Sequence, residues 1–383
     1  MRGGLRLLLA AFAALPLLGG CRAAQEPASP APSASPAPPR EVRDDLDQPS
    51  LRAAVAESLR FLRAVPGQRV LGKWPRRVTA REVRSSLIEF LALLNQPPEA
   101  DGSWPARVAE RFDFYPAPMS RARGDVLFTG YYQPVIDASP VETAEYRYPV
   151  YRVPDELRGR RGRARRTGYS RQDIDVLGRL RGKGYEIAWL RDPVDRFFLH
   201  IQGSGLLRMT DGRKVPLNFA GHNGRQYTSI GKVLIDQGKL DRETLSMQRI
   251  RAWLAEFPGE REALFARNER YIFFRLGKKG PLGSLGVPLT AGRSAATDHG
   301  IYPKGALLFV ETQTPVVGED GGLAGWRPVV RFVLNQDSGA AIRGPARVDL
   351  YFGTGDAAGA QAGYMKSTGR LYLLLKRGPA PLN

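Results

Sequence analysis

Residues 335–355 read Asn335-Gln336-Asp337-Ser338-Gly339-Ala340-Ala341-Ile342-Arg343-Gly344-Pro345-Ala346-Arg347-Val348-Asp349-Leu350-Tyr351-Phe352-Gly353-Thr354-Gly355. The apolar run before Asp337 predicts one strand, and residues 347–352 predict another, with Asp349 on the face opposite Val348 and Leu350. Because aspartate is disfavoured within strands, its ordinary place would be an outward, half-exposed face. The surrounding glycines instead let backbone or ligand approach closely. Asp337 and Asp349 are therefore candidate reactive carboxylates.

From Val126 onward, the chain consists of short apolar or alternating runs separated by Gly, Pro and Asp, a pattern typical of β-strands. The expected strands are residues 126–128, 148–153, 185–189, 197–201, 271–274, 306–311, 328–334, 347–352 and 371–375. Three helices are expected: one capped by Ser50 and ended by Pro66, one capped by a Thr79–Glu82 box, and one at residues 241–256. The fold class is mainly β with a few helices, and the strand spacing suits barrels better than a doubly wound sheet.

Composition excludes several classes of protein. The 383 residues include 57 Lys and Arg against 38 Asp and Glu, a net charge of +19, and 43% are hydrophobic, which rules out a wholly disordered chain. One Cys rules out an intrachain disulfide, and with only three His we expect no metal and no cofactor. The charge by itself is compatible with nucleic acid, an anionic membrane surface or an acidic polymer.

The first residues have the features of an export signal. Arg2 and Arg6 flank the start of an apolar run that ends in Leu18-Gly19-Gly20-Cys21, so residues 1–20 are predicted to be a signal peptide. The run also resembles the bacterial lipobox, which implies a lipid anchor on Cys21; an ordinary secretory signal with a chance Cys is the alternative. Arg22, in place of an Asp retention signal, implies the periplasmic face of the outer membrane of a Gram-negative bacterium. Export removes nucleic acid as an expected partner.

Residues 21–49 are assigned to the lipidated Cys and a Pro/Ala/Ser tether, of which residues 23–40 are expected to be extended and solvated. A second basic feature is the cluster of Arg residues at 158–166, interrupted by Gly and Ala. It is either a solvated surface loop or a site of attraction to anionic lipid head groups or wall polymer.

Polar side chains in three further segments suit the recognition of sugar hydroxyl and N-acetyl groups. These segments are residues 128–135, with vicinal tyrosines on opposite faces of a strand, residues 197–205, which end in a Gly-Ser loop, and the turn at residues 221–224. Each taken alone would be ordinary aromatic packing or an ordinary turn.

Taken together, the segments resemble the membrane-bound lytic murein transglycosylase A family. The matching motifs, in chain order, are Thr129-Gly130-Tyr131-Tyr132-Gln133-Pro134-Val135, Asp192-Pro193-Val194-Asp195-Arg196-Phe197-Phe198, Ile201-Gln202-Gly203-Ser204-Gly205, Tyr227-Thr228-Ser229-Ile230-Gly231, Ser246-Met247-Gln248-Arg249-Ile250, Gly286-Val287-Pro288-Leu289-Thr290, Arg293-Ser294, Asp298, Asp337-Ser338-Gly339 and Val348-Asp349-Leu350-Tyr351. They span roughly residues 115–376. Each motif is weak by itself, whereas the ordered set is specific.

The resemblance implies a double-psi β-barrel domain made of residues 50–133 and 276–383 with the N-terminal helices, its part at about 290–376 being a three-aspartate domain. A smaller inserted β-barrel domain would occupy residues 134–275, and the groove between the two would bind a peptidoglycan glycan strand. By position, Asp349 matches the catalytic acid/base and Asp337 its supporting carboxylate. The implied substrate-binding residues are Thr129, Tyr131, Gln202, Ser204, Asn223 and Asp298.

The implied reaction is non-hydrolytic cleavage of the β-1,4 bond between N-acetylmuramic acid and N-acetylglucosamine, leaving 1,6-anhydromuramic acid ends during wall turnover and remodelling. Other wall-synthesis or lytic proteins are conceivable partners. A non-catalytic peptidoglycan-binding lipoprotein and a hydrolase of the same glycan remain alternatives, because fold does not fix function. Catalysis requires Asp337 and Asp349 to face one cleft and a raised pKa for Asp349. His200, His222 and Asn335 depart from the family's usual Gln, Asn and Ala.

Overall fold

The computed structural model describes residues 37–39, 41–96, 104–118, 125–157 and 169–378. The expected signal peptide, the lipid attachment at Cys21 and the Arg cluster at residues 158–166 lie outside these residues. Among the described helices, none has both the length and the apolar character needed to cross a bilayer.

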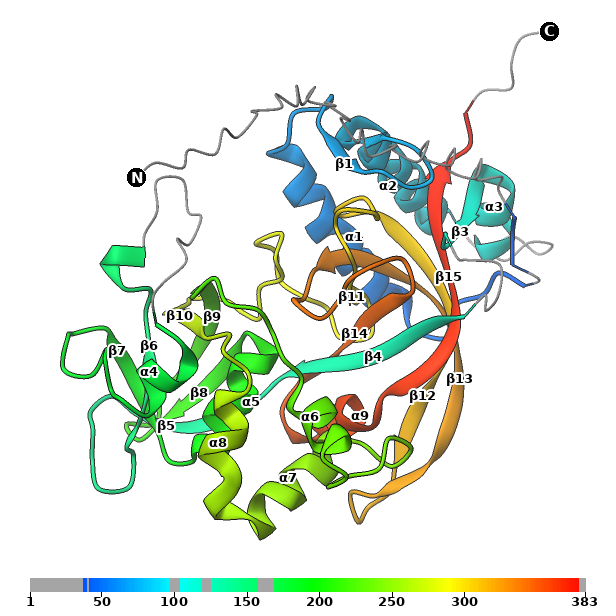
Figure 1. The fold of residues 1–383 in the computed structure, drawn as a ribbon. Coiled ribbons are helices and arrows are strands. Elements are labelled where there is room, and N and C mark those ends of the chain that lie inside the picture. The colour runs from blue at the N-terminus through cyan, green and yellow to red at the C-terminus, as the bar shows by residue number, and fades with distance from the viewer. Residues whose placement is uncertain (1–36, 40, 97–103, 119–124, 158–168, 379–383) are drawn as a thin grey trace, which may run out of the picture. The chain divides into compact units, whose positions relative to one another are not determined.

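Seven strands build a barrel sheet (Figure 1). They are β3 (Phe112–Pro116), β4 (Val126–Gln133), β11 (Ser294–Ala296), β12 (Leu307–Val317), β13 (Leu323–Asp337), β14 (Arg347–Thr354) and β15 (Lys366–Lys376). Their order is β12-β13-β11-β14-β4-β15-β3, and a further pairing of β12 with β15 closes a ring of the first six. The pairs β11–β13 and β14–β4 are parallel. The predicted mainly β, barrel-type fold is confirmed.

The N-terminal helices cover this barrel with their apolar faces. Helices α1 (Gln48–Arg63), α2 (Ala80–Asn95) and α3 (Trp104–Arg111) accompany a small hairpin, β1 (Val70–Gly72) and β2 (Val78–Thr79). Phe90 of α2 packs against Phe332 of β13, with ring centroids 5.1 Å apart. The Thr79–Glu82 capping box is confirmed. Ser50 is not the cap of α1, however, because Asp47 occupies that position and accepts the Ser50 backbone N–H.

Asp44 and Asp45, which lie in the segment assigned to the tether but after its Pro/Ala/Ser part, are anchored to the barrel. Asp44 accepts two hydrogen bonds of 2.8 Å from the Arg293 guanidinium, and both side chains are almost fully buried. Asp45 pairs in the same way with Arg331, at 2.7 and 2.8 Å. Two arginines of the barrel thus supply partners that the Pro/Ala/Ser composition cannot reveal.

A second sheet is formed by β5 (Val135–Ser139), β6 (Tyr148–Tyr151), β7 (Glu186–Leu190), β8 (Gly205–Met209), β9 (Lys214–His222) and β10 (Ile272–Leu276). Its order is β10-β9-β8-β5-β7-β6, and the edge strands β10 and β6 approach each other, so the sheet is barrel-like. Short helices surround it: η1 (Asp155–Leu157), α4 (Arg171–Asp175), α5 (Pro193–Gln202), α6 (Ile230–Asp236), α7 (Met247–Glu256), η2 (Pro258–Glu260) and α8 (Arg261–Ala266). The last helix, α9 (Asp356–Tyr364), follows β14 of the barrel.

Two predictions in this region are wrong. Residues 197–201 belong to helix α5 instead of a strand: Asp192 caps it, Pro193 begins it, and Gly203 ends it in the left-handed conformation. The ring of Phe197 stacks on the ring of Phe265 in α8, with centroids 4.3 Å apart. This tertiary contact stabilises the helical conformation of residues 197–201. The helix expected at 241–256 begins at Met247, where the Ser246 hydroxyl provides the cap.

Candidate active site

Four neighbouring barrel strands place the candidate residues in one row. Asp337 of β13 is in register with Ala296 of β11, Ala296 with Asp349 of β14, and Asp349 with Thr129 of β4. Side chains directly opposite one another on paired strands project from the same face. Asp337, Asp349 and Thr129 therefore face one cleft, as the predicted chemistry requires.

The row depends on an irregularity in β13. Ala295 pairs with Asn335, but the next residue, Ala296, pairs with Asp337, so Gln336 is an extra residue in the strand. A bulge of this kind redirects the side chains that follow it. Gln336 is buried and held from inside, donating to the Ala54 carbonyl at 2.7 Å and accepting from the Ser294 hydroxyl at 2.6 Å. The bulge is what brings Asp337 into line with Asp349.

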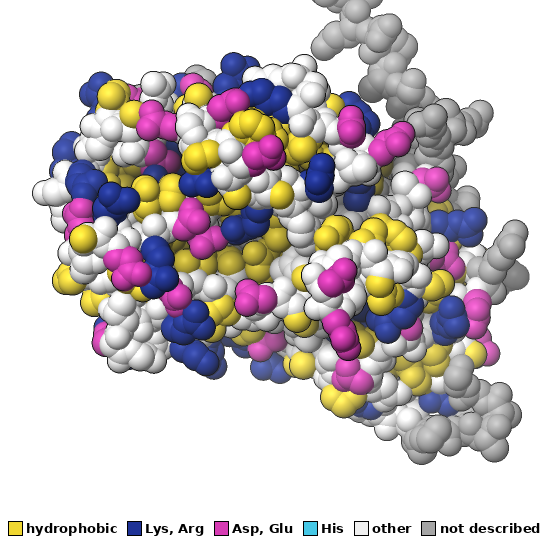
Figure 2. Space-filling view, turned by 90° about the horizontal axis from the view of Figure 1, so that it is seen from below, with side chains coloured by type: hydrophobic (Ala, Val, Ile, Leu, Met, Phe, Trp, Pro, Cys, Tyr) yellow, Lys and Arg dark blue, Asp and Glu magenta, His cyan; other side chains and the backbone are white. Residues whose placement is uncertain are grey.

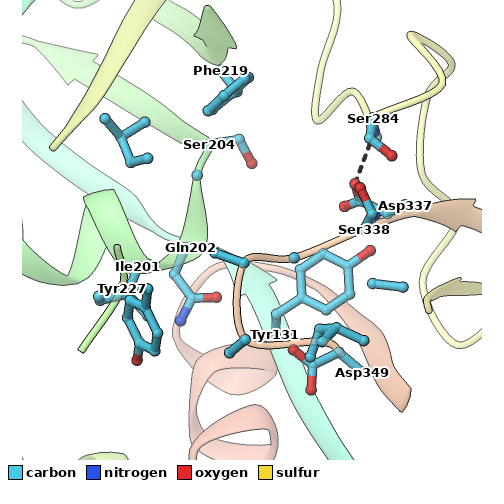
Figure 3. Close-up of a pocket in the computed structure, with 18 of the residues that line it drawn as sticks. Tyr131, Ile201, Gln202, Ser204, Phe219, Tyr227, Ser284, Asp337, Ser338 and Asp349 are labelled. Carbon is cyan, nitrogen blue, oxygen red and sulfur yellow. Dashed lines mark hydrogen bonds between the residues drawn. The ribbon is translucent and has the colours of Figure 1, made fainter. Parts of the chain in front are cut away.

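The groove around this row has a volume of about 1020 Å³. Thr129, Tyr131, Gln202, Ser204 and the three aspartates of the C-terminal part all line it, together with residues of both sheets. Figure 3 shows Tyr131 projecting from β4 between the two labelled aspartates, with Gln202 and Ser204 on the facing wall. Seven of the eight predicted catalytic and substrate-binding residues are therefore brought together.

Asp349 lies in a desolvated part of this groove. Its Oδ1 is buried and has no hydrogen-bond partner among the described residues, while the Arg347 Nη2 atom lies 4.0 Å away. Burial raises the pKa of Asp349 to about 6; Arg347 opposes this rise and the Asp337 carboxylate adds to it. A carboxyl group with such a pKa can exist as the acid near neutral pH and donate a proton.

Asp337 has a different environment although it stands in the same row. Its Oδ1 accepts backbone N–H groups from Ser284 and Ser338, both at 2.8 Å, the first of which is drawn in Figure 3. Burial raises its pKa, and these two hydrogen bonds counteract the rise because they favour the ionised form. Asp337 is thus held in place as an acceptor, which suits a supporting carboxylate.

Asp298 stabilises the backbone of two segments at the groove. Its two carboxylate oxygens accept the N–H groups of Gly300 and Gly344, at 2.8 and 2.9 Å. It therefore fixes the loop that joins β13 to β14. Among the described residues that line the groove, Asp349 alone has a carboxylate that accepts no backbone hydrogen bond.

Asn223 does not support its predicted role. It is fully buried, outside the groove lining, and its side chain donates to the carbonyls of Tyr169 and Glu269 and accepts from the Tyr271 N–H. The Asn223 side chain thus connects the backbone of these segments behind the wall of the groove. A Gly-rich turn in the sequence does not distinguish this internal role from exposure to a ligand.

The three departures from the family pattern fall in different places. His200 is buried, and its Nδ1 lies 3.1 Å from Nη1 of the equally buried Arg171. Asn335 is wholly internal and bonded to Thr297 and the Pro303 carbonyl. His222 lines the groove, where its Nδ1 accepts the Gly224 N–H at 2.9 Å.

Two groove residues were given no role in the sequence analysis, although Tyr227 opens one of the quoted family motifs. Arg347 stands two residues before Asp349 on the same strand face and donates to the Thr129 hydroxyl at 3.1 Å. Tyr227 is close enough to Asp349 for the carboxylate to raise its pKa, although burial is the larger cause. The period of two along β14 could have identified Arg347, and the motif that begins at Tyr227 could have identified Tyr227. No group of three or more His, Cys, Asp or Glu suited to a metal occurs in the described part of the chain.

A closed barrel, a second barrel-like sheet and a groove in which burial raises the pKa of two carboxyl groups define a class of protein equipped for acid–base chemistry on an extended ligand. Residues 127–275 match the family described as the MltA specific insert domain, and residues 293–375 match the 3D domain. Membrane-bound lytic murein transglycosylase A of Escherichia coli K12 is 39% identical over 257 residues, an alignment that spans 66% of this chain and 66% of that relative.

Solved structures agree over a longer span. The crystal structure of a membrane-bound lytic murein transglycosylase from Agrobacterium tumefaciens is 32% identical, with a TM-score of 0.73 over 90% of this chain and 98% of that one. The structure of Escherichia coli MltA with bound chitohexaose is 29% identical, with a TM-score of 0.69 over 91% and 98% of the two chains. The chain belongs to the membrane-bound lytic murein transglycosylase A family.

Proposed function

We propose that this protein is a lytic transglycosylase that cleaves the β-1,4 bond between N-acetylmuramic acid and N-acetylglucosamine in peptidoglycan, in the turnover and remodelling of the cell wall. The observation that carries the proposal is the isolation of Asp349: a desolvated carboxyl group, with a pKa of about 6, at the floor of a groove large enough for several sugars. The chitohexaose bound to the Escherichia coli neighbour supports a glycan ligand in such a groove.

One carboxyl group suffices for this reaction. Protonated Asp349 gives its proton to the glycosidic oxygen as the bond from that oxygen to C1 of the muramic acid breaks. The C6 hydroxyl of the same residue attacks C1, and its proton passes to the Asp349 carboxylate. A 1,6-anhydro ring and a free 4-hydroxyl result, no water is consumed, and Asp349 is again protonated.

Nearby groups adjust the two protonation states of Asp349. Arg347, 4.0 Å away, stabilises the carboxylate that forms when the proton is donated. Asp337 favours the acid form, and its own carboxylate is fixed by two backbone N–H groups, so it can face the positive charge that develops at C1. The site thus combines a proton donor with a fixed negative charge.

The geometry disfavours the alternatives. A hydrolase of the usual kind needs a second carboxylate to act as nucleophile or to activate water. Asp298 and Asp337 both accept hydrogen bonds from backbone N–H groups, so oxygens that would have to activate water are already engaged. A non-catalytic binding protein has no use for an Asp349 whose buried Oδ1 accepts no hydrogen bond within the described residues, because burial of this carboxylate costs folding free energy at neutral pH.

Mass analysis of the muropeptides released from isolated sacculi tests the reaction. We expect 1,6-anhydromuramic ends from the wild type and none from Asp349→Asn. Asp241→Asn, an exposed change outside the groove, should behave as wild type. Products with free reducing ends would instead identify a hydrolase, and full activity of Asp349→Asn would remove Asp349 from the mechanism.

The place of action follows from the N-terminal sequence and the relatives' names, which describe membrane-bound enzymes. We propose that Cys21 carries the lipid anchor and that the protein faces the periplasm from the outer membrane. We also propose that the barrel sheet and the second sheet correspond to two domains, at residues 50–133 with 276–383 and at 134–275. Metabolic labelling with a radioactive fatty acid should mark the wild type but not Cys21→Ala, and labelling of both would place the lipid elsewhere.

A further inference from the structure

Arg270 and Arg343 are among the groove-lining arginines that form no ion pair within the described part of the chain, and the proposed mechanism does not use them. Arg270 precedes β10 of the second sheet, and Arg343 lies in the loop between β13 and β14 of the barrel. Both line the groove that contains Asp349. Glu269, the acid next to Arg270, is paired with Arg225 at 3.4 Å, and neither Arg270 nor Arg343 forms an ion pair within the described part of the chain.

Both groups stand on fixed backbone. The carbonyl of Arg270 accepts a 2.6 Å hydrogen bond from the buried Arg171, and its own Nη1 donates to the Arg225 carbonyl at 3.3 Å. The loop that carries Arg343 is held by the bond from Gly344 N–H to Asp298 and by the Tyr302 hydroxyl, which donates to the Pro345 carbonyl at 2.7 Å. The backbone at both positions is therefore fixed before a ligand binds, which reduces the ordering cost of binding.

The two cations also lie close enough to influence each other. Burial lowers the pKa of Arg270, and the charge of Arg343 lowers it further. On the face seen in Figure 2, by contrast, Lys and Arg side chains are interspersed with Asp and Glu. Two like charges that line one groove and form no ion pair within the described residues are stabilised when an anion enters.

We propose that Arg270 and Arg343 form a subsite for the carboxylate that N-acetylmuramic acid carries on its C3 substituent. N-acetylglucosamine has no such group, so the subsite would distinguish the two sugars and set the register of the glycan relative to Asp349. This inference rests on the proposed function, since it concerns the ligand of the same groove. The carboxylate is either that of the lactyl group, free on naked strands, or one of those on the attached peptide.

Binding measurements test the subsite independently of turnover. Dissociation constants are compared for Arg270→Gln, Arg343→Gln and the double variant, each in wild-type and Asp349→Asn backgrounds. The ligands are naked glycan strands, peptide-bearing strands and neutral chitohexaose. Because a hydrogen bond to a charged group contributes more than a neutral one, we expect each single change to weaken binding of an acidic strand about tenfold or more. Binding of chitohexaose should stay within about twofold of wild type, well below that tenfold effect.

Matched controls remove the same charge elsewhere: Arg267→Gln next to α8 and Arg327→Gln in β13, both exposed and outside the groove lining. Weaker binding of naked strands identifies the lactyl carboxylate, and weaker binding of peptide-bearing strands alone identifies the peptide. Unchanged binding of both acidic ligands, or an equal loss for chitohexaose, overturns the subsite. If the wild type releases no anhydro products, the proposed reaction fails, but the binding comparison still decides the subsite.

Discussion

Asp337 and Asp349 stand in the same register row of the barrel, with only Ala296 of β11 between them. Because both carboxyl groups project from one face into a desolvated groove, the charge of Asp337 helps to raise the pKa of Asp349. The pair is therefore a coupled unit in which one member is held by backbone N–H groups and the other is free to exchange its proton.

Asp349→Asn should stabilise the protein at neutral pH. A carboxyl group whose pKa is about 6 when folded and 3.8 as the reference binds its proton more tightly in the native state, so the wild type loses stability as pH rises between these values. At pH 7 the difference is on the order of 2–3 kcal/mol in favour of Asn. Urea unfolding at pH 3.5 and pH 7 measures it, and equal stability of the two proteins at pH 7 would contradict a raised pKa.

Asp337→Asn should move the alkaline limb of the pH–activity profile to lower pH. The Asn oxygen can still accept the N–H groups of Ser284 and Ser338, so the local structure is retained while the charge is removed. Without that charge the pKa of Asp349 falls, and fewer molecules carry the required proton. The profile of kcat/KM against pH reports this pKa in the free enzyme. An alkaline limb that moves to higher pH would contradict the prediction that the Asp337 charge raises the pKa of Asp349.

Arg347→Met should have the opposite effect on that limb. Removing the cation 4.0 Å from Asp349 takes away an interaction that favours the carboxylate, so the pKa of Asp349 rises. Thr129→Val is the matched control, because it removes the partner of the Arg347 hydrogen bond but no charge. The alkaline limb should move only in the Arg347 variant. The same shift in both variants would mean that loss of the hydrogen bond, and not loss of the charge, is the cause.

His200→Leu should destabilise the fold by about 1–3 kcal/mol, because the buried Arg171 loses an acceptor. His200→Gln, which restores the usual family residue, offers an amide oxygen and should be close to wild type at neutral pH. Burial and the charges of Arg171 and Arg196 hold the pKa of His200 well below 6.5, so wild-type stability falls as pH drops below that value. Below pH 6.5 the Gln variant should become relatively more stable in urea unfolding; equal pH dependence would indicate a charged His200.

Asp44→Ala should destabilise the protein by about 3–5 kcal/mol, because it leaves the fully buried Arg293 without its counter-charge. Glu41→Ala, an exposed change three residues earlier, is expected to have little effect. Thermal or urea unfolding of both variants compares them, and a difference of less than about 1 kcal/mol would show that the anchor contributes little.

Much of the site could be predicted because its residues lie in ordered local patterns. The strand ending at Asp337 and the alternation around Asp349 were both found from period and composition, and the family motifs added the groove residues. The helix at α5 was missed because a short apolar run does not distinguish a strand from a helix, although the Asp-Pro start and Gly203 end were present. Asn223 was misassigned because polarity in a turn does not reveal which way a side chain points.

By itself the sequence determined the barrel class, the two carboxylates and the family, because these depend on side-chain periodicity and on motifs that follow one another along the chain. Only the tertiary structure decided the Asp44–Arg293 anchor, whose members are 249 residues apart, and the bulge at Gln336 that aligns Asp337 with Asp349. It also decided the surroundings that raise the pKa of Asp349. The pKa of a carboxyl group depends on how many non-local groups exclude water from it and on which charges they carry. Neither can be inferred from its neighbours in the sequence.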